Sequence, residues 1–196
     1  MTDSATDQAA AAARPGKRER LVAAATQLLH QQGIERTTLA GIAQAADVPA
    51  GNLYYYFKSK DEVIAAVIEA HAHQIKTTLA VIDAHHRSPK NRLKALVREF
   101  GAQGEIVAHY GCPFGSLCSE LGKRASQPAF AAAELMSLPI EWAEKQFRSL
   151  GRRDANDLAL DLLAAYEGSA LLANTLGDPD VLSRAARRLG HWIDTL

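Results

Sequence analysis

The chain has 196 residues, of which 47% are apolar and 22% charged. This length allows one large domain, or a small domain joined to a larger one, with a buried core in either case. The 22 basic and 22 acidic residues cancel, so the overall charge neither supports nor excludes a nucleic-acid partner. Two cysteines, Cys112 and Cys118, are too few for a secreted disulfide framework, and no apolar run is long enough to cross a membrane. We therefore expect a cytoplasmic protein with no membrane partner.

The first segment is polar and rich in alanine, and we expect residues 1–16 to form a flexible tail. From Lys17 onward, apolar residues recur at helical spacing until Gly33, a residue type that commonly ends helices. The spacing predicts a first helix over residues 17–32. Alanine and leucine dominate most of the later apolar positions as well, which favours an all-α fold.

Two short helical patterns around a tight turn follow. Thr37 or Thr38 can cap the first of them. Its apolar residues form one stripe, made of Leu39, Ile42, Ala43 and Ala46. Asp47 and Val48 form the turn, and Pro49 suits the first turn of the next helix. The pattern predicts a DNA-binding helix-turn-helix.

The faces of the second short helix follow from a rotation of about 100° per residue. Leu53 and Phe57, four residues apart, define its buried face. Tyr55 points away from that face, and Gly51 and Asn52 lie largely on the same outward side. A glycine there lets another backbone approach closely, and a short amide can contact a base edge or a phosphate. On either side of the buried face lie Tyr54 and Tyr56.

Positive charge gathers in this first region. Residues 13–60 carry seven basic and three acidic side chains, whereas residues 61–196 are nearly neutral. Ser59 and Glu62 form a capping box that starts a further helix at Lys60. A cation at this positive helix end is unfavourable, so an external phosphate would account for it. Alternatively, the acidic residues of that first turn already compensate the charge.

The segment from Thr38 to Lys60 resembles the DNA-binding domain of the tetracycline-repressor (TetR) family. The resemblance covers residues 17–65 and includes the helix pattern, the turn, the aromatic cluster and the following lysine. It implies that Tyr56 and Lys60 bind phosphates with help from Thr38 and Tyr54. It also implies that Gly51, Asn52 and Tyr55 face the major groove of double-stranded DNA. Many members have histidine where Tyr56 stands, but a phenol can also donate to a phosphate.

Six further helices are predicted after the helix-turn-helix. Their apolar patterns cover approximately residues 60–86, 90–110, 114–123, 126–150, 154–176 and 179–195. Pro139 should kink or break the fourth of these helices, because proline lacks a backbone donor. We expect a tail at 1–16, a DNA-binding domain at 17–60 and a ligand-binding and dimerisation domain at 61–196.

The resemblance implies a homodimer that pairs its last two long helices, and a small-molecule cavity in each larger domain. A monomeric core could also absorb the apolar residues of those two helices. The candidate interface residues are Leu163, Leu171, Leu182, Leu189 and Trp192. The candidate cavity residues are Phe100, Tyr110, Cys112, Phe114, Met136, Trp142 and Tyr166. Most of the aromatic residues among them could equally be ordinary core.

Catalytic and metal-binding patterns are missing from the sequence. Four histidines between His71 and His86 lack the spacing of metal ligands on a helix, so we expect a surface or pocket-rim role and no metal or cofactor. Cys112 precedes a short helix whose dipole could lower the pKa of its thiol. Alternatively, Cys112 is a small buried residue at a tight turn.

The sequence is best explained by a ligand-responsive repressor that is not an enzyme. It would bind a palindromic operator as a homodimer and leave it when a small-molecule inducer binds. The main alternative is a regulator that senses electrophiles or oxidants through Cys112. A third is an all-α enzyme or carrier that contains a helix-turn-helix.

Overall fold

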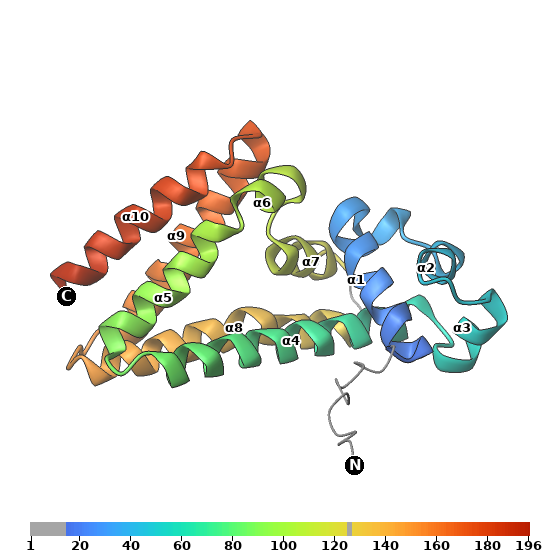
Figure 1. Cartoon of the computed structure of the whole chain (residues 1–196), viewed down its shortest axis with the longest axis horizontal. Helices are drawn as coiled ribbons and strands as arrows, with labels where there is room; N and C mark the ends of the chain where they lie inside the picture. The colour runs from blue at the N-terminus through green and yellow to red at the C-terminus, as the bar shows by residue number, and fades with distance from the viewer. Residues whose placement is uncertain (1–14, 125–126) are drawn as a thin grey trace, which may run out of the picture.

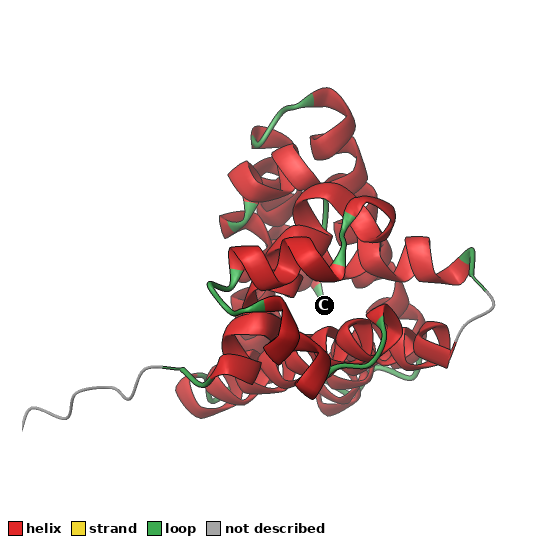
Figure 2. Ribbon diagram, turned by 90° about the vertical axis from the view of Figure 1, so that its right-hand side faces the viewer, coloured by secondary structure: helices red, strands yellow, loops and turns green. Residues whose placement is uncertain are grey.

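A computed structural model describes residues 15–124 and 127–196, and within them every regular element is a helix (Figures 1 and 2). The all-α prediction is confirmed for this part of the chain. Most of the predicted tail, residues 1–14, lies outside the described residues. None of the described helices is both long and apolar enough to span a membrane.

The N-terminal domain contains three helices. They are α1 (Lys17–Arg36), α2 (Leu39–Ala45) and α3 (Ala50–Tyr56). Thr38 caps α2, since its Oγ1 accepts a hydrogen bond from the Gly41 amide at 3.0 Å. The predicted end of the first helix is a sharp break within α1, where Gly33 has φ 77° and ψ 174°. A short helical turn follows this break, so α1 extends to Arg36.

The larger domain contains seven helices in the described residues, one more than predicted. They are α4 (Lys60–His85), α5 (Pro89–Ala102), α6 (Gly104–Tyr110), α7 (Pro113–Gly122), α8 (Gln127–Ser149), α9 (Ala155–Leu176) and α10 (Asp180–Thr195). The expected single helix over 90–110 is broken at Gln103, which separates α5 from α6. Just after the break, Gly104 permits the close approach of Pro179, because a Cβ there would lie 2.8 Å from the Pro179 carbonyl oxygen.

Pro139 does not break α8, which continues through it (Figure 1). Proline costs the helix one backbone hydrogen bond, to the carbonyl four residues earlier. Helix α8 packs along α4 on one side and α9 on another, and these contacts hold the helix together despite that loss.

The helices of the larger domain form two groups around one core. In Figure 1, α4 and α8 run side by side along the lower edge, while α5, α9 and α10 form the upper part. Helices α6 and α7 lie between this body and the N-terminal domain. Helix α7 contacts both α8 and α1, so it connects the core of the larger domain with α1.

Polar contacts hold α1 against α7 and the residues on either side of α7. The Glu120 carboxylate, on α7, accepts a hydrogen bond from the Ile34 amide at 2.7 Å. Arg124 forms an ion pair with Glu35 at 3.0 Å, and His30 Nε2 lies 2.9 Å from the Gly111 carbonyl oxygen. The N-terminal domain is therefore joined to the larger one through α6 and α7 as well as through α4.

Replacing Gly33 by alanine should lower the free energy of unfolding by about 1–3 kcal/mol, because its backbone conformation is almost exclusive to glycine. The new Cβ would also lie 2.9 Å from Glu120 Oε1 and disturb the contact with α7. Urea denaturation measures this loss. Gly122→Ala is the matched control, since nothing lies within 4 Å of its Cβ position. Equal stability of both variants would contradict the prediction.

Candidate functional site

Helix α3 presents the outward face that its sequence predicts. Leu53 and Phe57 are buried, whereas Tyr54 and Tyr55 are 54% and 76% exposed. Gly51 is exposed, and no atom lies within 4 Å of its Cβ position. Large aromatic side chains that stay in water at a helix surface are available to a partner.

Three side chains beside this face are less exposed than Tyr55 or already have a contact partner. Tyr56 is half-buried, and its ring lies edge-on to that of Tyr55, with 5.0 Å between centroids. Asn52 is also half-buried. Lys60 opens α4, and its Nζ lies 3.5 Å from the Glu35 carbonyl oxygen, a long contact that a phosphate could replace. Asp61 and Glu62 lie in the same first turn of α4, as is required if acidic residues compensate the charge of Lys60.

Two basic residues have structural roles that the sequence patterns did not reveal. Arg20 Nη1 donates to the carbonyl oxygens of Ala46 and Asp47, at 3.1 and 3.3 Å. Asp47 has a positive φ of 50°, so Arg20 holds the strained turn between α2 and α3. Lys58 Nζ donates to the Tyr54 carbonyl oxygen at 2.7 Å and so caps the end of α3.

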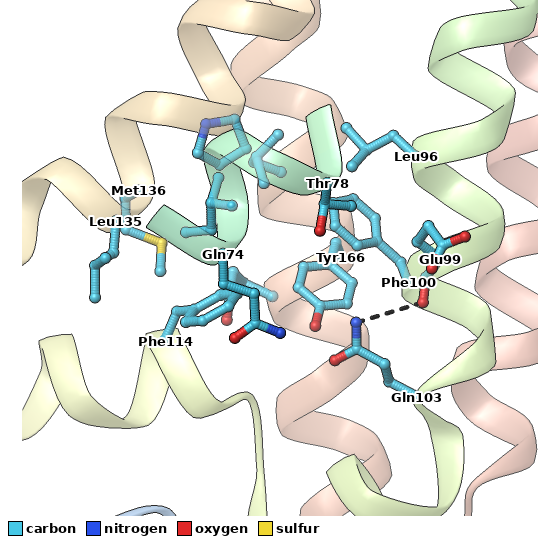
Figure 3. Close-up of a pocket in the computed structure, with 14 residues that line it drawn as sticks. Gln74, Thr78, Leu96, Glu99, Phe100, Gln103, Phe114, Leu135, Met136 and Tyr166 are labelled. Carbon is cyan, nitrogen blue, oxygen red and sulfur yellow. Dashed lines mark hydrogen bonds between the residues drawn. The ribbon is translucent and has the colours of Figure 1, made fainter. Parts of the chain in front are cut away.

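A cavity of about 150 Å³ lies in the larger domain, between α4, α5, α7, α8 and α9 (Figure 3). Four predicted cavity residues line it, namely Phe100, Phe114, Met136 and Tyr166. The rings of Phe100 and Tyr166 stack with 4.0 Å between centroids. The polar lining was not predicted and consists of Gln74, Thr78, Glu99, Gln103 and Glu167.

The other three predicted cavity residues do not line it. Trp142 is buried and donates its indole N–H to Asp83 Oδ2 at 3.1 Å. Tyr110 packs edge-on against His30, towards α1. Cys112 lies behind the wall, where its thiol contacts Tyr166 and Glu167. Aromatic content alone did not distinguish these positions, because core and cavity use the same residue types.

Cys112 belongs to a buried hydrogen-bonded chain. The Tyr166 hydroxyl lies 3.7 Å from Cys112 Sγ, and the thiol donates to Glu167 Oε1 at 3.3 Å. Burial, reinforced by the Glu167 carboxylate, raises the pKa of the Cys112 thiol to about 12. The Gly115 amide at the start of α7 donates to this sulfur and lowers the pKa, but by less. The thiol pKa is therefore raised, and not lowered by the helix dipole, and the burial of Cys112 fits the alternative of a small buried residue at a tight turn.

His71 was expected at the surface or at a pocket rim, and it is buried. Its ring lies edge-on to that of Phe114, with 4.9 Å between centroids, and so joins α4 to α7. Burial, followed by the charge of His30, lowers the pKa of His71 to about 4. The imidazole is therefore neutral near pH 7. Within the described residues, His, Cys, Asp and Glu do not gather in groups suited to a metal ion.

The predicted interface residues fall into two groups. Leu171 is 67% exposed on α9, while Leu189 and Trp192 are half-buried beside a shallow groove between α9 and α10. Leu163 lines the cavity and Leu182 is buried in the core, so neither can reach a partner. The exposed leucines that were not predicted are Leu160, Leu172 and Leu176.

Comparison with known proteins shows to which family this chain belongs. Residues 21–67 match the family described as "Bacterial regulatory proteins, tetR family". An HTH-type transcriptional regulator from the lacX 3′ region of Lactococcus lactis subsp. lactis is 31% identical over 170 residues, covering 84% of this chain and 87% of that protein. The chain belongs to the TetR family of transcriptional regulators.

Other similar proteins agree with this family. The HTH-type transcriptional regulator BetI of Paraburkholderia phymatum is 28% identical over 191 residues, which cover 93% of this chain and 94% of BetI. A TetR transcriptional regulator from Legionella pneumophila has the same fold, with a TM-score of 0.81 and 24% identity. That alignment covers 92% of this chain and 97% of the Legionella chain.

The thiol of Cys112 should react slowly in the folded TetR-family chain. With a pKa of about 12, only about one thiol in ten thousand is ionised at pH 8. We expect iodoacetamide to modify Cys112 at least about a hundredfold more slowly in the folded protein than in concentrated urea. Site-resolved mass spectrometry measures both rates. Equal rates would restore the case for a thiol sensor.

Proposed function

We propose that this regulator is a ligand-responsive repressor that binds a palindromic operator as a homodimer and is released by a small-molecule inducer. The supporting observation is that helix α7 contacts both the cavity and the DNA-binding domain. Phe114, at the start of α7, lines the cavity, and Glu120, near its end, bonds to the Ile34 amide of α1. A ligand that displaces Phe114 would therefore move the helix that holds the DNA-binding domain.

The release follows from unequal binding to two arrangements of the protein. A ligand shifts a conformational equilibrium only if it binds one state more tightly than the other. In the operator-bound state, the two α3 helices would lie about one DNA turn apart, ~34–36 Å. An inducer in the cavity would favour a state in which α4 and α7 have moved and this spacing is lost. Such a regulator acts in the cytoplasm, where the bacterial chromosome lies.

The homodimer is proposed from the outer face of α9 and α10. Leu171 and Leu172 are exposed beside Ala164, Ala165 and Gly168, three small residues that permit close helix packing. An apolar face of this kind on two neighbouring helices is typical of a self-association surface. This face supports a four-helix bundle in which α9 and α10 of one subunit pack against α9 and α10 of the other across a two-fold axis. Helix α10 would contribute Leu189 and Trp192.

Footprinting on the DNA that flanks the protein's own gene tests the proposal as a whole. Protection of a palindrome, lost when an inducer is added, is the expected result. Binding without sequence preference would contradict a specific repressor. Protection that no small molecule reverses would contradict ligand control.

Lys60→Ala should weaken binding to all DNA sequences by a similar factor, about tenfold, because a phosphate contact carries no sequence information. The slope of log K against log salt should fall by about one per subunit. Asn52→Ala should instead change the base preference at one position of each half-site. Fluorescence anisotropy over a salt series measures both effects. Lys145→Ala removes the same charge from the exposed far end of α8 and should leave binding unchanged.

Leu171→Glu should convert the dimer to a monomer, because it places a charge in the centre of the proposed apolar interface. Sedimentation velocity measures the state of association, and circular dichroism checks that the helices remain. Val81→Glu, at an apolar position of α4 that is 51% exposed, is the control and should remain dimeric. A Leu171→Glu variant that stays dimeric would show that the interface lies elsewhere.

A further inference from the structure

The cavity has an unusual balance of charge. Two carboxylates line it, Glu99 on α5 and Glu167 on α9. No lysine, arginine or histidine is among its lining residues in the described part of the chain. Neither carboxylate forms an ion pair within the same residues. The cavity lining therefore holds two carboxyl groups and no basic side chain to act as their counter-ion.

Its walls suit an aromatic or alkyl group. Phe100 and Tyr166 stack on one side, and Phe114 closes another, as Figure 3 shows. Apolar cavities of about 150 Å³ hold a molecule the size of benzene. Aromatic faces also attract organic cations through their ring quadrupole. Volume and wall chemistry thus agree with a compact group that carries positive charge.

Glu167 is held in place before any ligand binds. The Cys112 thiol donates to its Oε1 at 3.3 Å. Its Oε2 lies so close to Gly115 that a Cβ there would be 2.4 Å away. The carboxylate is therefore positioned against the first turn of α7 by one hydrogen bond and by the missing side chain of a glycine. Burial raises the pKa of Glu167, and a bound cation would offset this effect by favouring the ionised form.

We propose that the cavity binds a small organic cation, an arylalkyl ammonium, with Glu167 as its counter-ion, Glu99 at the rim and the aromatic group between Phe100, Phe114 and Tyr166. This inference rests on the proposed function, in which the cavity is the inducer site. It adds the chemical class of the ligand. It also explains how binding reaches the DNA-binding domain, because Phe114 belongs to the first turn of α7 and Glu167 contacts that turn at Gly115.

Isothermal titration calorimetry on the full-length, DNA-free protein tests this proposal with three probes of similar size. They are benzylammonium, neutral benzyl alcohol and anionic benzoate. We expect the cation to bind at least about tenfold more tightly than either of the others, since a buried carboxylate attracts a cation and repels an anion. This comparison uses the unaltered chain and does not depend on how a variant folds.

Glu167→Gln keeps the shape of the side chain and an acceptor for the Cys112 thiol, and it should weaken cation binding by about tenfold or more. Glu99→Gln should have a smaller effect, about twofold to threefold, because its carboxylate is exposed to water. Glu141→Gln removes an exposed charge of α8 that is not part of the cavity and is the control. Binding of the neutral probe should be the same in all variants.

The outcomes separate the two proposals. Absence of cation binding, equal or tighter binding of the neutral or anionic probe, or undiminished binding to Glu167→Gln would each overturn the cation proposal. Operator binding is measured independently on the same samples by fluorescence anisotropy. Failure of sequence-specific DNA binding would overturn the proposed function, whereas intact operator binding that only a neutral or anionic compound reverses would overturn the ligand class alone.

Discussion

The hydrogen bond from the Ile34 amide to the Glu120 carboxylate connects the two halves of this protein. It forms only because Gly33 turns the chain with a positive φ that exposes the next amide. The first amides of a helical turn have no partner within the turn, and a carboxylate from another helix satisfies one of them here. The position of α1 therefore depends on α7, and α7 in turn forms a wall of the cavity.

The helix-turn-helix was predictable in detail, because its faces follow from a fixed rotation per residue. Leu53 and Phe57 are buried and Tyr55 is exposed as that rotation requires. The break at Gly33 was also visible as a stop signal. What could not be foreseen was the continuation beyond it, since the partner of the freed amide lies 86 residues away, on α7.

The cavity was harder to predict, because a buried aromatic residue has the same sequence pattern in a core as in a pocket wall. Phe100 and Tyr166 line the cavity, whereas Trp142 does not and instead donates its indole N–H to Asp83 on α4. The polar lining was missed for a related reason. Glu167 interrupts an apolar helix, and only its contact with Gly115 of α7 and its place in the cavity lining show where this interruption points.

Arg20 gives the DNA-binding domain a rigidity that has a consequence for the whole regulator. Its guanidinium bonds to both carbonyl oxygens of the strained turn, so α2 and α3 are held at a fixed angle to α1. A domain held rigid in this way presents the same DNA-binding surface in any orientation relative to the larger domain. In the proposed repressor, the base sequence that each half recognises and the signal to which the dimer responds would therefore be set by separate groups of residues, and one could diverge during evolution without changing the other.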